Sequence, residues 1–377
     1  MRIVVIGAGI IGASIAEALA RRGAEVLVLD MRGPGQGASH ASAGLLAPYT
    51  EAQGENPLLL MGVRSLALFD DFIARIREHS GMTIEYARTG TFEVAQTEDD
   101  VARLLAMQAW MEMNEIWNHW MEGDAACSFE PALSPGILGG LFIDKHGFVG
   151  VPGLISALIK SAESAGAKVE KLVQAIEVLP GSDGVRVRAE GYGYEAEHSS
   201  DFVVVSAGSW SASVRVEGVQ ALPVRPVRGQ LLHLDWRGEP APRRPVWSHG
   251  CYTVPWSDGT VLVGATVEEV GFDESTTDSA REMLRSAAAS VLPAAKRATL
   301  IEARAGLRPA TLDGLPFIGT AAGAPRVMFA TGHYRNGVLL APLTAAMVEA
   351  AILDGRTDAM MARTSPNRLA SGGGGGR

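Results

Sequence analysis

Cysteine is scarce in this chain of 377 residues, which contains only Cys127 and Cys251. The two lie far apart, and neither belongs to a Cys-x-x-Cys or Cys/His pattern. We therefore expect no disulfide framework, no zinc scaffold and no metal site. Such sparing use of cysteine favours a reducing cytoplasm as the location of the protein.

Long apolar runs and clusters of basic residues are also missing. Although 47% of the residues are hydrophobic, no run reaches the roughly 18 uncharged apolar residues of a membrane span, so we expect none. The apolar start of the chain superficially resembles a signal peptide, but its glycine spacing argues against one. The formal net charge is −9 and the Lys and Arg residues are scattered, which argues against nucleic-acid binding. The tail, residues 371–377, is rich in glycine and is predicted to be disordered.

What the chain does contain, at residues 2–30, is a β-rich run, a glycine turn, an Ala-rich helical stretch and a second β-rich run. Gly7, Gly9 and Gly12 form G-x-G-x-x-G, and Asp30 closes the second run. Glycines permit the tight turn, the close approach of a pyrophosphate and the packing of helix on strand, while an acidic residue accepts ribose hydroxyls. This pattern predicts a dinucleotide-binding βαβ unit and does not choose between NAD and FAD.

Beyond residue 30 the pattern is discontinuous, with further βα pieces in the middle and at the end of the chain. Hydrophobic periodicity predicts helices over 56–78, 98–120, 151–166 and 278–292. Alternating runs predict antiparallel strands over 171–197 and a hairpin over 251–266, and apolar runs at 201–210 and 326–330 predict buried strands. Because proline is best tolerated in the first turn of a helix, Pro342 predicts that the last helix begins at 339–341.

Several segments carry a resemblance to a known family when they are taken in order along the chain. They are the glycine fingerprint, ASAGLLAP at 41–48, VVVSAGSWS at 203–211, CYTVP and VLVGAT within 251–266, GLRPATLDGLPFIG at 306–319 and TGHYRNGVLLAP at 331–342. Together they resemble the FAD-dependent D-amino-acid oxidase family, and most of all the glycine oxidases of thiamine biosynthesis. The small, Ser-rich segment 38–48 is compatible with passage beside a flat ring system, although by itself it also fits a plain surface loop.

The resemblance implies an α/β fold, with a Rossmann-type FAD-binding domain and a discontinuous antiparallel-sheet substrate domain. The implied FAD-binding domain comprises 1–45, 145–220 and 300–370, and the implied substrate-binding domain comprises 46–144 and 221–299. Relatives are often tetramers, so a homo-oligomer is expected by analogy.

The implied cofactor is non-covalent FAD, because neither cysteine lies in a motif that supports a covalent link. The resemblance implies that Arg32, Ala41 and Ser42 lie along the ribose, pyrophosphate or flavin of the cofactor, and that Val173 contacts its adenine end. The residues assigned to the cofactor are Gly7, Gly9, Ile11, Gly12, Asp30, Arg32, Ala41, Ser42, Val173, Ala207, Gly208, Trp210, His333, Arg335, Asn336, Gly337, Val338 and Leu339.

The substrate-contacting residues implied by the resemblance are Arg308 as carboxylate anchor, Tyr252 as hydrogen-bond partner, and Arg335 close to both substrate and flavin. A planar guanidinium grips a carboxylate with two charge-assisted hydrogen bonds, which orients the substrate. A structural ion pair for Arg308 and a packed aromatic for Tyr252 remain the alternatives. His249 and His333 are candidates for proton transfer, although hydride removal from a neutral amine needs no protein base.

Two further features concern specificity and packing. Glycine oxidases can carry a histidine before the Cys-Tyr pair, whereas this chain has Gly250, so its substrate preference could differ. Trp110, Trp117 and Trp120 fall at near-helical spacing, and core or interface packing is the favoured interpretation. Cys251 should point away from the neighbouring tyrosine, because side chains alternate along a strand.

The expected activity is the flavin-dependent oxidative deamination of glycine or similarly small amines, such as sarcosine or small D-amino acids. Hydride passes to FAD, and O2 reoxidises the flavin and yields H2O2. A dehydrogenase of the same fold that delivers electrons to a quinone or carrier is the main alternative. An FAD-bound structural or regulatory subunit and an NAD-dependent reductase are weaker ones, because they leave Arg308 and the other C-terminal motifs unexplained.

Overall fold

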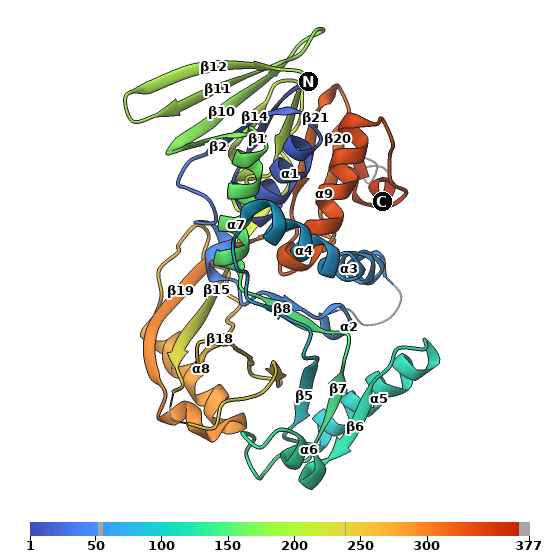
Figure 1. Ribbon diagram of the computed structural model, residues 1–377, viewed down its shortest axis with the longest axis vertical. Helices are drawn as coiled ribbons and strands as arrows, with labels where there is room; N and C mark the ends of the chain where they lie inside the picture. Colours follow the sequence, from blue (N-terminus) through green and yellow to red (C-terminus); the bar gives the residue numbers. More distant parts are fainter. Residues whose placement is uncertain (52–55, 238, 369–377) are drawn as a thin grey trace, which may run out of the picture.

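Segments far apart in the sequence combine in each half of the molecule. The computed structural model describes residues 1–51, 56–237 and 239–368 (Figure 1). The upper half in Figure 1 mixes blue, green and red segments from the start, middle and end of the chain, whereas the lower half is mainly cyan, yellow and orange. The tail at 371–377, predicted to be disordered, lies outside the described residues.

A six-stranded sheet with the order β20-β21-β13-β1-β2-β9 forms the centre of the upper half. Its strands are β1 (Arg2–Ile6), β2 (Glu25–Asp30), β9 (Lys168–Lys171), β13 (Phe202–Val205), β20 (Phe317–Ala321) and β21 (Ala324–Thr331). All neighbours pair in parallel except β20 and β21. Both faces are covered, which explains the apolar runs in the central strands β1, β2, β13 and β21.

The two faces of this sheet have different cover. Ile3 and Val5 of β1 pack with the helices, whereas Val4 and Ile6 pack on the opposite side with a second sheet. The helices are α1 (Ile10–Arg21), α3 (Pro57–Ala67), α4 (Phe69–Ser80), α7 (Val151–Ser164) and α9 (Gly337–Leu353). The second sheet has the order β12-β11-β10-β14, with β10 (Val173–Pro180), β11 (Val185–Gly191), β12 (Tyr194–Ser200) and β14 (Arg215–Val216).

The lower half is built on an eight-stranded sheet with the order β19-β15-β18-β17-β16-β5-β7-β6. Its strands are β5 (Thr91–Ala95), β6 (His119–Glu122), β7 (Gly139–Ile143), β15 (Arg225–Asp235), β16 (Val246–Trp247), β17 (Tyr252–Pro255), β18 (Thr260–Gly264) and β19 (Thr299–Ala310). Pairing is antiparallel except between β16 and β5. Helices α6 (Gly123–Phe129) and α8 (Asp278–Val291) contribute to one core of this half, and α5 (Glu98–Met113) packs on β7 in another.

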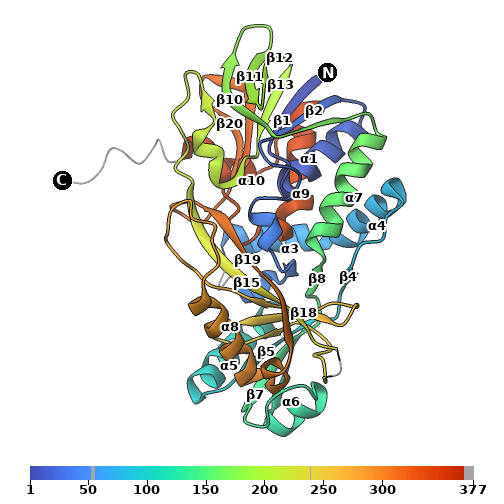
Figure 2. The same ribbon diagram turned by 90° about the vertical axis from the view of Figure 1, so that its left-hand side faces the viewer.

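Short elements connect the two halves. A three-stranded sheet of β3 (Leu45–Leu46), β8 (Gly147–Val149) and β4 (Tyr86–Ala87) lies between them, next to α2 (Pro48–Glu51) (Figure 1). The remaining elements are α10 (Met360–Thr364) and the 3-10 turns Ala38–Ala41, Gly208–Ser213 and Pro293–Lys296. Figure 2 shows the long strands β15 and β19 running from the lower half up to the base of the upper one.

Two helix predictions needed correction in the first half of the chain. The helix predicted over 56–78 is divided at Leu68 into α3 and α4. The helix predicted over 98–120 ends at Met113, because Glu115 adopts a left-handed conformation with φ 56°, and Trp120 lies in β6 instead. Trp117 is 54% exposed and packs edge-to-face on Phe142.

The start of the last helix was also predicted wrongly. Helix α9 begins at Gly337, and Pro342 is its sixth residue rather than part of its first turn. Proline has no N–H for the helical ladder, so one intrahelical hydrogen bond is lost there. The next N–H, that of Leu343, donates to Ser65 Oγ of α3 at 3.2 Å, and Leu340 and Ala341 are fully buried. Tertiary packing therefore offsets the proline.

Two elements bear on the division into domains. Strand β19, assigned from the sequence to the FAD-binding part, pairs along β15 in the eight-stranded sheet. Helices α3 and α4, assigned to the substrate-binding part, share a core with α1, α7 and α9. We therefore retain the division as a proposal, with β19 moved to the substrate-binding part and α3 and α4 moved to the FAD-binding part.

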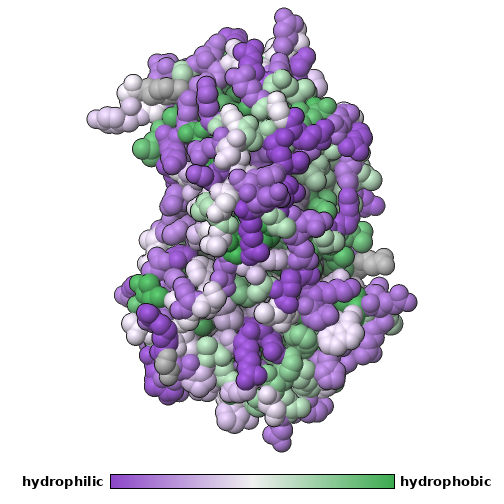
Figure 3. Space-filling model, in the orientation of Figure 1, coloured by the Kyte–Doolittle hydropathy of each residue, from purple (hydrophilic) through white to green (hydrophobic). Residues whose placement is uncertain are grey.

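Hydrophilic residues cover most of the face shown in Figure 3, and apolar residues lie among them in small groups. Within the described ranges, no helix combines the length and apolar character required to cross a bilayer. The same part of the chain contains no group of three or more His, Cys, Asp or Glu side chains arranged to hold a metal ion.

Candidate cofactor and substrate site

One cavity gathers almost all of the site residues predicted from the sequence. It lies at the carboxyl ends of β1, β2, β13 and β21, and it continues past β17 and β19 to the start of α9. Ligands of open parallel sheets bind at this edge. Every residue assigned above to cofactor or substrate lines this cavity except Gly12. The structure thus brings together residues separated by more than three hundred positions in the chain, such as Gly7 and Leu339.

The glycine turn leaves no room for side chains. Gly7 has φ 98°, and a Cβ on it would lie 2.6 Å from the backbone oxygen of Ser206. A Cβ on Gly12 would lie 1.8 Å from the oxygen of Gly7, so Gly12 stands behind the cavity wall and permits α1 to pack against the turn. At the start of α1, the Ile10 N–H donates to Ser39 Oγ at 3.1 Å. The turn and the helix N-terminus therefore present backbone donors where a phosphate can approach closely.

Asp30 is fixed at the end of β2 by backbone donors. Its carboxylate accepts from the N–H groups of Ala8 at 2.7 Å, Arg32 at 2.9 Å and Gly33 at 2.7 Å. A carboxylate has about four acceptor positions, so these bonds leave capacity for one hydroxyl. This geometry suits a residue that binds a ribose.

Arg32 lies at the same end of the cavity and has a partner that the sequence did not indicate. Its guanidinium contacts Glu274 with both nitrogens, at 3.0 Å and 2.7 Å, and lies 4.2 Å above the centre of the Trp210 ring. Phe272 also packs on Trp210, with 5.7 Å between ring centres. Asp273, which lies between Phe272 and Glu274 in sequence, forms an ion pair at 2.5 Å with the buried Arg228. A strap formed by residues 267–277 thus reaches from the substrate-binding half across this end of the cavity.

The start of α9 supplies a second set of backbone donors. The first intrahelical bond runs from the Leu340 N–H to the Asn336 oxygen at 2.8 Å, so Gly337, Val338 and Leu339 form the first turn and line the cavity. The first N–H groups of a helix have no intrahelical acceptors, and the helix dipole makes this end positive. The opening of α9 can therefore bind a carbonyl or an anionic ring edge.

The residues just before α9 are tightly held. Tyr334 has φ 50°, which is unusual for a residue with a side chain, and its N–H donates to the Pro309 oxygen at 2.9 Å. His333 is 3% exposed, and its Nε2 lies 3.1 Å from Thr344 Oγ1. Burial lowers the pKa of His333 to about 3, so the ring is neutral at physiological pH. The turn directs Arg335 to the cavity, and His333 is not a protonated general acid there.

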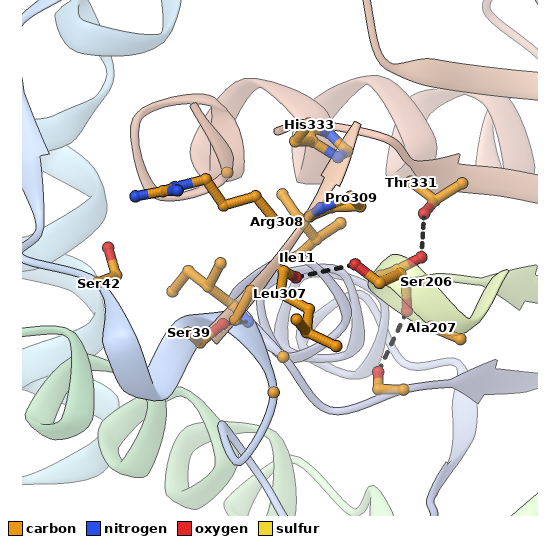
Figure 4. A pocket seen from close by; sticks show the side chains of 18 of the residues that line it. Ile11, Ser39, Ser42, Ser206, Ala207, Leu307, Arg308, Pro309, Thr331 and His333 are labelled. Atoms are coloured by element: carbon orange, nitrogen blue, oxygen red, sulfur yellow. Dashed lines mark hydrogen bonds between the residues drawn. The ribbon is translucent and has the colours of Figure 1, made fainter. Parts of the chain in front are cut away.

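Arg308 projects from β19 into the cavity. Its Nη1 donates to the backbone oxygens of Thr266 at 2.9 Å and Arg228 at 3.3 Å. A Cβ on Gly229 would lie only 2.1 Å from Arg308 Nη2, so the guanidinium rests directly on this glycine. In Figure 4 the side chain of Arg308 extends toward the side where Ser42 lies. The guanidinium is held in place by carbonyls and lines the cavity.

Tyr252 lies on β17 opposite Gly264 of β18. A Cβ on Gly264 would lie 2.4 Å from the Tyr252 hydroxyl oxygen, so the phenol ring lies across this glycine. The ring is also 5.2 Å from that of Trp247, another residue that lines the cavity. Sequence reasoning missed Gly229, Gly264 and Trp247, because only the pairing of strands places them against the predicted residues.

The neighbours of Tyr252 in sequence lie elsewhere. Cys251 belongs to a core with α8, and burial raises the pKa of its thiol. A Cβ on Gly250 would lie 3.4 Å from Ala287 of α8, and Gly250 is not among the cavity-lining residues within the described ranges. This glycine therefore does not widen the cavity. His249 is exposed beside Trp247 and Arg335, outside this cavity.

Comparison with known proteins defines the class to which this fold and site belong. A family model described as "FAD dependent oxidoreductase" (DAO) matches residues 2–351, and the chain belongs to this family. Within it, the chain is an FAD-dependent oxidoreductase of the glycine oxidase type. The predicted family, the mixed α/β fold and the FAD cofactor are confirmed.

Three comparisons illustrate the likeness. The chain is 32% identical to glycine oxidase of Geobacillus kaustophilus over 351 residues, which cover 92% of this chain and 91% of that one. It is 29% identical to glycine oxidase of Pseudomonas aeruginosa over 356 residues, covering 94% and 95% of the two chains. The crystal structure of the Geobacillus kaustophilus enzyme superposes with a TM-score of 0.91 at 30% identity, covering 97% of this chain and 99% of that one.

Proposed function

We propose that this protein oxidises glycine or similarly small amines, such as sarcosine and small D-amino acids. The observation that carries the proposal is that Arg308, Tyr252 and Arg335 line the same cavity as the glycine turn, Asp30 and the start of α9. FAD supplies the hydride acceptor, and O2 reoxidises it to give H2O2. The names of the related glycine oxidases support glycine as a substrate.

The cavity residues fit FAD in their chemistry. The turn at Gly7 and Gly9 offers backbone donors to a pyrophosphate, and Asp30 retains acceptor capacity for a ribose hydroxyl. Val173, Arg32 and Trp210 then lie at the adenine and ribose end. The first turn of α9 would hydrogen-bond the flavin edge that gains negative charge on reduction, and so stabilise the reduced form.

Arg308 is proposed to hold the α-carboxylate of the substrate. Its guanidinium is fixed against Gly229 and by the carbonyl of Thr266, so little side-chain entropy remains to be lost on binding. A two-pronged grip orients the Cα–H bond, which is the main requirement of hydride transfer. Tyr252 would donate a hydrogen bond to the carboxylate, and Arg335 would lie close to both substrate and flavin.

Proton chemistry at this site is proposed to depend on the substrate amine. His333 is held neutral by burial and bonds Thr344, which leaves it as part of the support for α9. We therefore assign it no proton transfer. The rate of flavin reduction should rise with pH as the bound amine loses its proton.

The physiological electron acceptor distinguishes the proposal from its alternative, a dehydrogenase that passes electrons to a quinone or carrier. Purified protein should be supplied with glycine, sarcosine, D-alanine and D-proline in air while O2 uptake and peroxide are measured. Stoichiometric peroxide supports the oxidase. Reduction of an artificial dye with little O2 uptake would favour the dehydrogenase, and no turnover by either route would refute both.

We further propose that the protein works in the cytoplasm as a homo-oligomer. The free cysteines Cys127 and Cys251 suit a reducing compartment. Met113 is 76% exposed and Trp117, four residues further along the chain, is 54% exposed, and both offer apolar surface for a second copy. Light scattering coupled to gel filtration tests the assembly, and a monomer at micromolar concentration would contradict it.

A further inference from the structure

A buried arginine of the lower half holds the strap of residues 267–277 in place. Arg228 lies on β15 and is 4% exposed. Its Nη2 donates to Glu268 at 2.6 Å, and its Nη1 donates to Asp273 at 2.5 Å and to the Ser275 carbonyl at 3.1 Å. The backbone of Arg228 also pairs with that of Glu268, through hydrogen bonds of 2.8 Å and 2.9 Å. One residue therefore fixes both the start and the middle of the strap.

The middle of the strap also contacts two residues of the cavity wall. On either side of Asp273 in sequence, Glu274 pairs with Arg32 at 2.7 Å and Phe272 packs on Trp210. Arg32 and Trp210 line the cavity, whereas none of the strap residues, all of which the structure describes, does so. The strap thus supports the cavity wall from outside.

The same arginine supports the guanidinium of Arg308 through its backbone. The Arg228 carbonyl accepts from Arg308 Nη1 at 3.3 Å, and the Thr266 carbonyl accepts from the same nitrogen at 2.9 Å. Thr266 immediately precedes the strap, and its hydroxyl donates to Glu268. Gly229, the next residue on β15, is the glycine on which the guanidinium rests. A shift at the start of the strap would therefore move the carbonyls that hold Arg308.

A second side chain of β15 secures the two ends of the strap. Gln230 Nε2 donates to Glu268 at 2.8 Å, and Gln230 Oε1 accepts at 2.7 Å from the N–H of Thr277, the capping residue of α8. Loss of the ion pair between Asp273 and Arg228 should therefore loosen the middle of the strap while its ends stay attached.

We propose that Arg228 is a positioning residue for both the cofactor and the substrate. Through the strap it keeps Arg32 and Trp210 in place at the cofactor end, and through its carbonyl it keeps Arg308 in position to bind a carboxylate. The inference rests on the proposed function, in which Arg308 binds the substrate carboxylate. Arg228 itself lies outside the set of cavity-lining residues in the described part of the chain, so it acts through other residues.

Asp273→Asn tests this shared role with little damage to the fold. The Asp273 side chain is 50% exposed, and asparagine keeps an oxygen for the Ser275 N–H while it removes the charge that faces Arg228. The variant should release FAD two- to fivefold faster and bind acetate, the simplest carboxylate probe, two- to fivefold more weakly. Dilution follows the release of FAD, and the change in flavin absorption follows the binding of acetate. A wild-type value for either quantity would overturn the proposal.

A matched control and a double-variant cycle separate the strap from general damage. Asp358→Asn breaks an exposed pair of 2.6 Å with Arg64 and should leave FAD release and acetate binding unchanged. In the cycle, Asp273→Asn is combined with Glu274→Gln. Once the middle of the strap is loosened, the second substitution should speed FAD release by less than it does in the wild type. Full additivity would show two independent contacts and would count against the proposal.

Arg228→Lys tests the arginine directly. Lysine keeps the charge but loses the planar fork that reaches Glu268 and Asp273 together. The variant should weaken acetate binding at least as much as Asp273→Asn does. In turnover with glycine it should raise KM by more than it lowers kcat, because Arg308 still orients the substrate once it is bound. A loss of kcat with an unchanged KM would contradict a positioning role.

The proposed function and this inference can fail separately. FAD release and acetate binding are measured without turnover, so the expected changes in Asp273→Asn support the positioning role even if no amine is oxidised. An enzyme that oxidises glycine, but whose Asp273→Asn variant matches the wild type in both quantities, would reject the positioning role alone. Wild-type protein that does not bind acetate would also overturn the inference.

Discussion

Gly229 provides the sharpest test of how Arg308, the proposed substrate anchor, is positioned. An alanine Cβ at this position would lie 2.1 Å from Nη2, 2.2 Å from Cζ and 2.3 Å from Nη1 of Arg308. Ordinary contact needs about 3.5 Å, so the guanidinium must retreat by about 1.4 Å. Because a misplacement of about 1 Å in a binding group can cost about 100-fold, Gly229→Ala should lower kcat/KM for glycine by about that factor.

The assay must separate this loss from damage to the fold or to cofactor binding. FAD affinity, measured by flavin fluorescence, should change less than threefold, since Gly229 contacts Arg308 and not the glycine turn. Gly153→Ala on α7, where a Cβ meets nothing within 4 Å, is the control and should keep full activity. A Gly229→Ala enzyme with kcat/KM within threefold of the wild type would show that the position of Arg308 does not control substrate binding.

Three further predictions concern the strap, the buried histidine and the tyrosine. Glu274→Gln removes the ion-pair partner of Arg32, and the two side chains of this pair are about one-third exposed. The variant should release FAD two- to fivefold faster in a dilution assay, equivalent to about 0.5 to 1 kcal/mol. An unchanged rate would count against a role of the strap in holding the cofactor. His333 has its pKa lowered from 6.5 to about 3 by burial, so the unfolded chain binds more protons between these values and stability falls as the pH drops from about 6.5. In urea unfolding, this effect should lower the free energy of unfolding by about 2 kcal/mol at pH 5. Between pH 8 and pH 5, His333→Gln should lose less unfolding free energy than the wild type, and an identical pH dependence in the two proteins would contradict the effect. Gly264→Ala pushes on the Tyr252 ring, whereas Tyr252→Phe removes one hydrogen bond worth about 1 kcal/mol, so the glycine variant should lose more kcat/KM for glycine; the opposite order would be inconsistent with a ring held in place by Gly264.

Local sequence patterns were sufficient to predict much of the fold. The βαβ unit over 2–30 was predicted because apolar runs, the glycine turn and Asp30 all act within one short stretch. The hairpin of β17 and β18 was predicted for the same reason, with Asp258-Gly259 as its turn. Helix boundaries were less predictable, since the left-handed Glu115 and the bond from Leu343 to Ser65 depend on the backbone and on tertiary contacts.

Only part of the cavity could be predicted from the sequence. Recurring motifs identified Arg308, Tyr252 and the start of α9, because each motif keeps its residues adjacent in sequence. The residues that hold them in place come from other strands and from the strap. Gly229 supports Arg308 across β15 and β19, and Glu274 reaches Arg32 from 242 positions away. Such contacts between distant segments have no local signal in a single sequence.

The most direct measurement of the central claim is anaerobic mixing of the FAD-loaded protein with glycine, sarcosine, D-alanine and D-proline. If the cavity positions an amine for hydride transfer, at least one of these compounds should bleach the yellow flavin band in a single turnover. Arg308→Met should slow the bleaching at subsaturating substrate. A flavin band that stays oxidised with all four compounds would contradict the account.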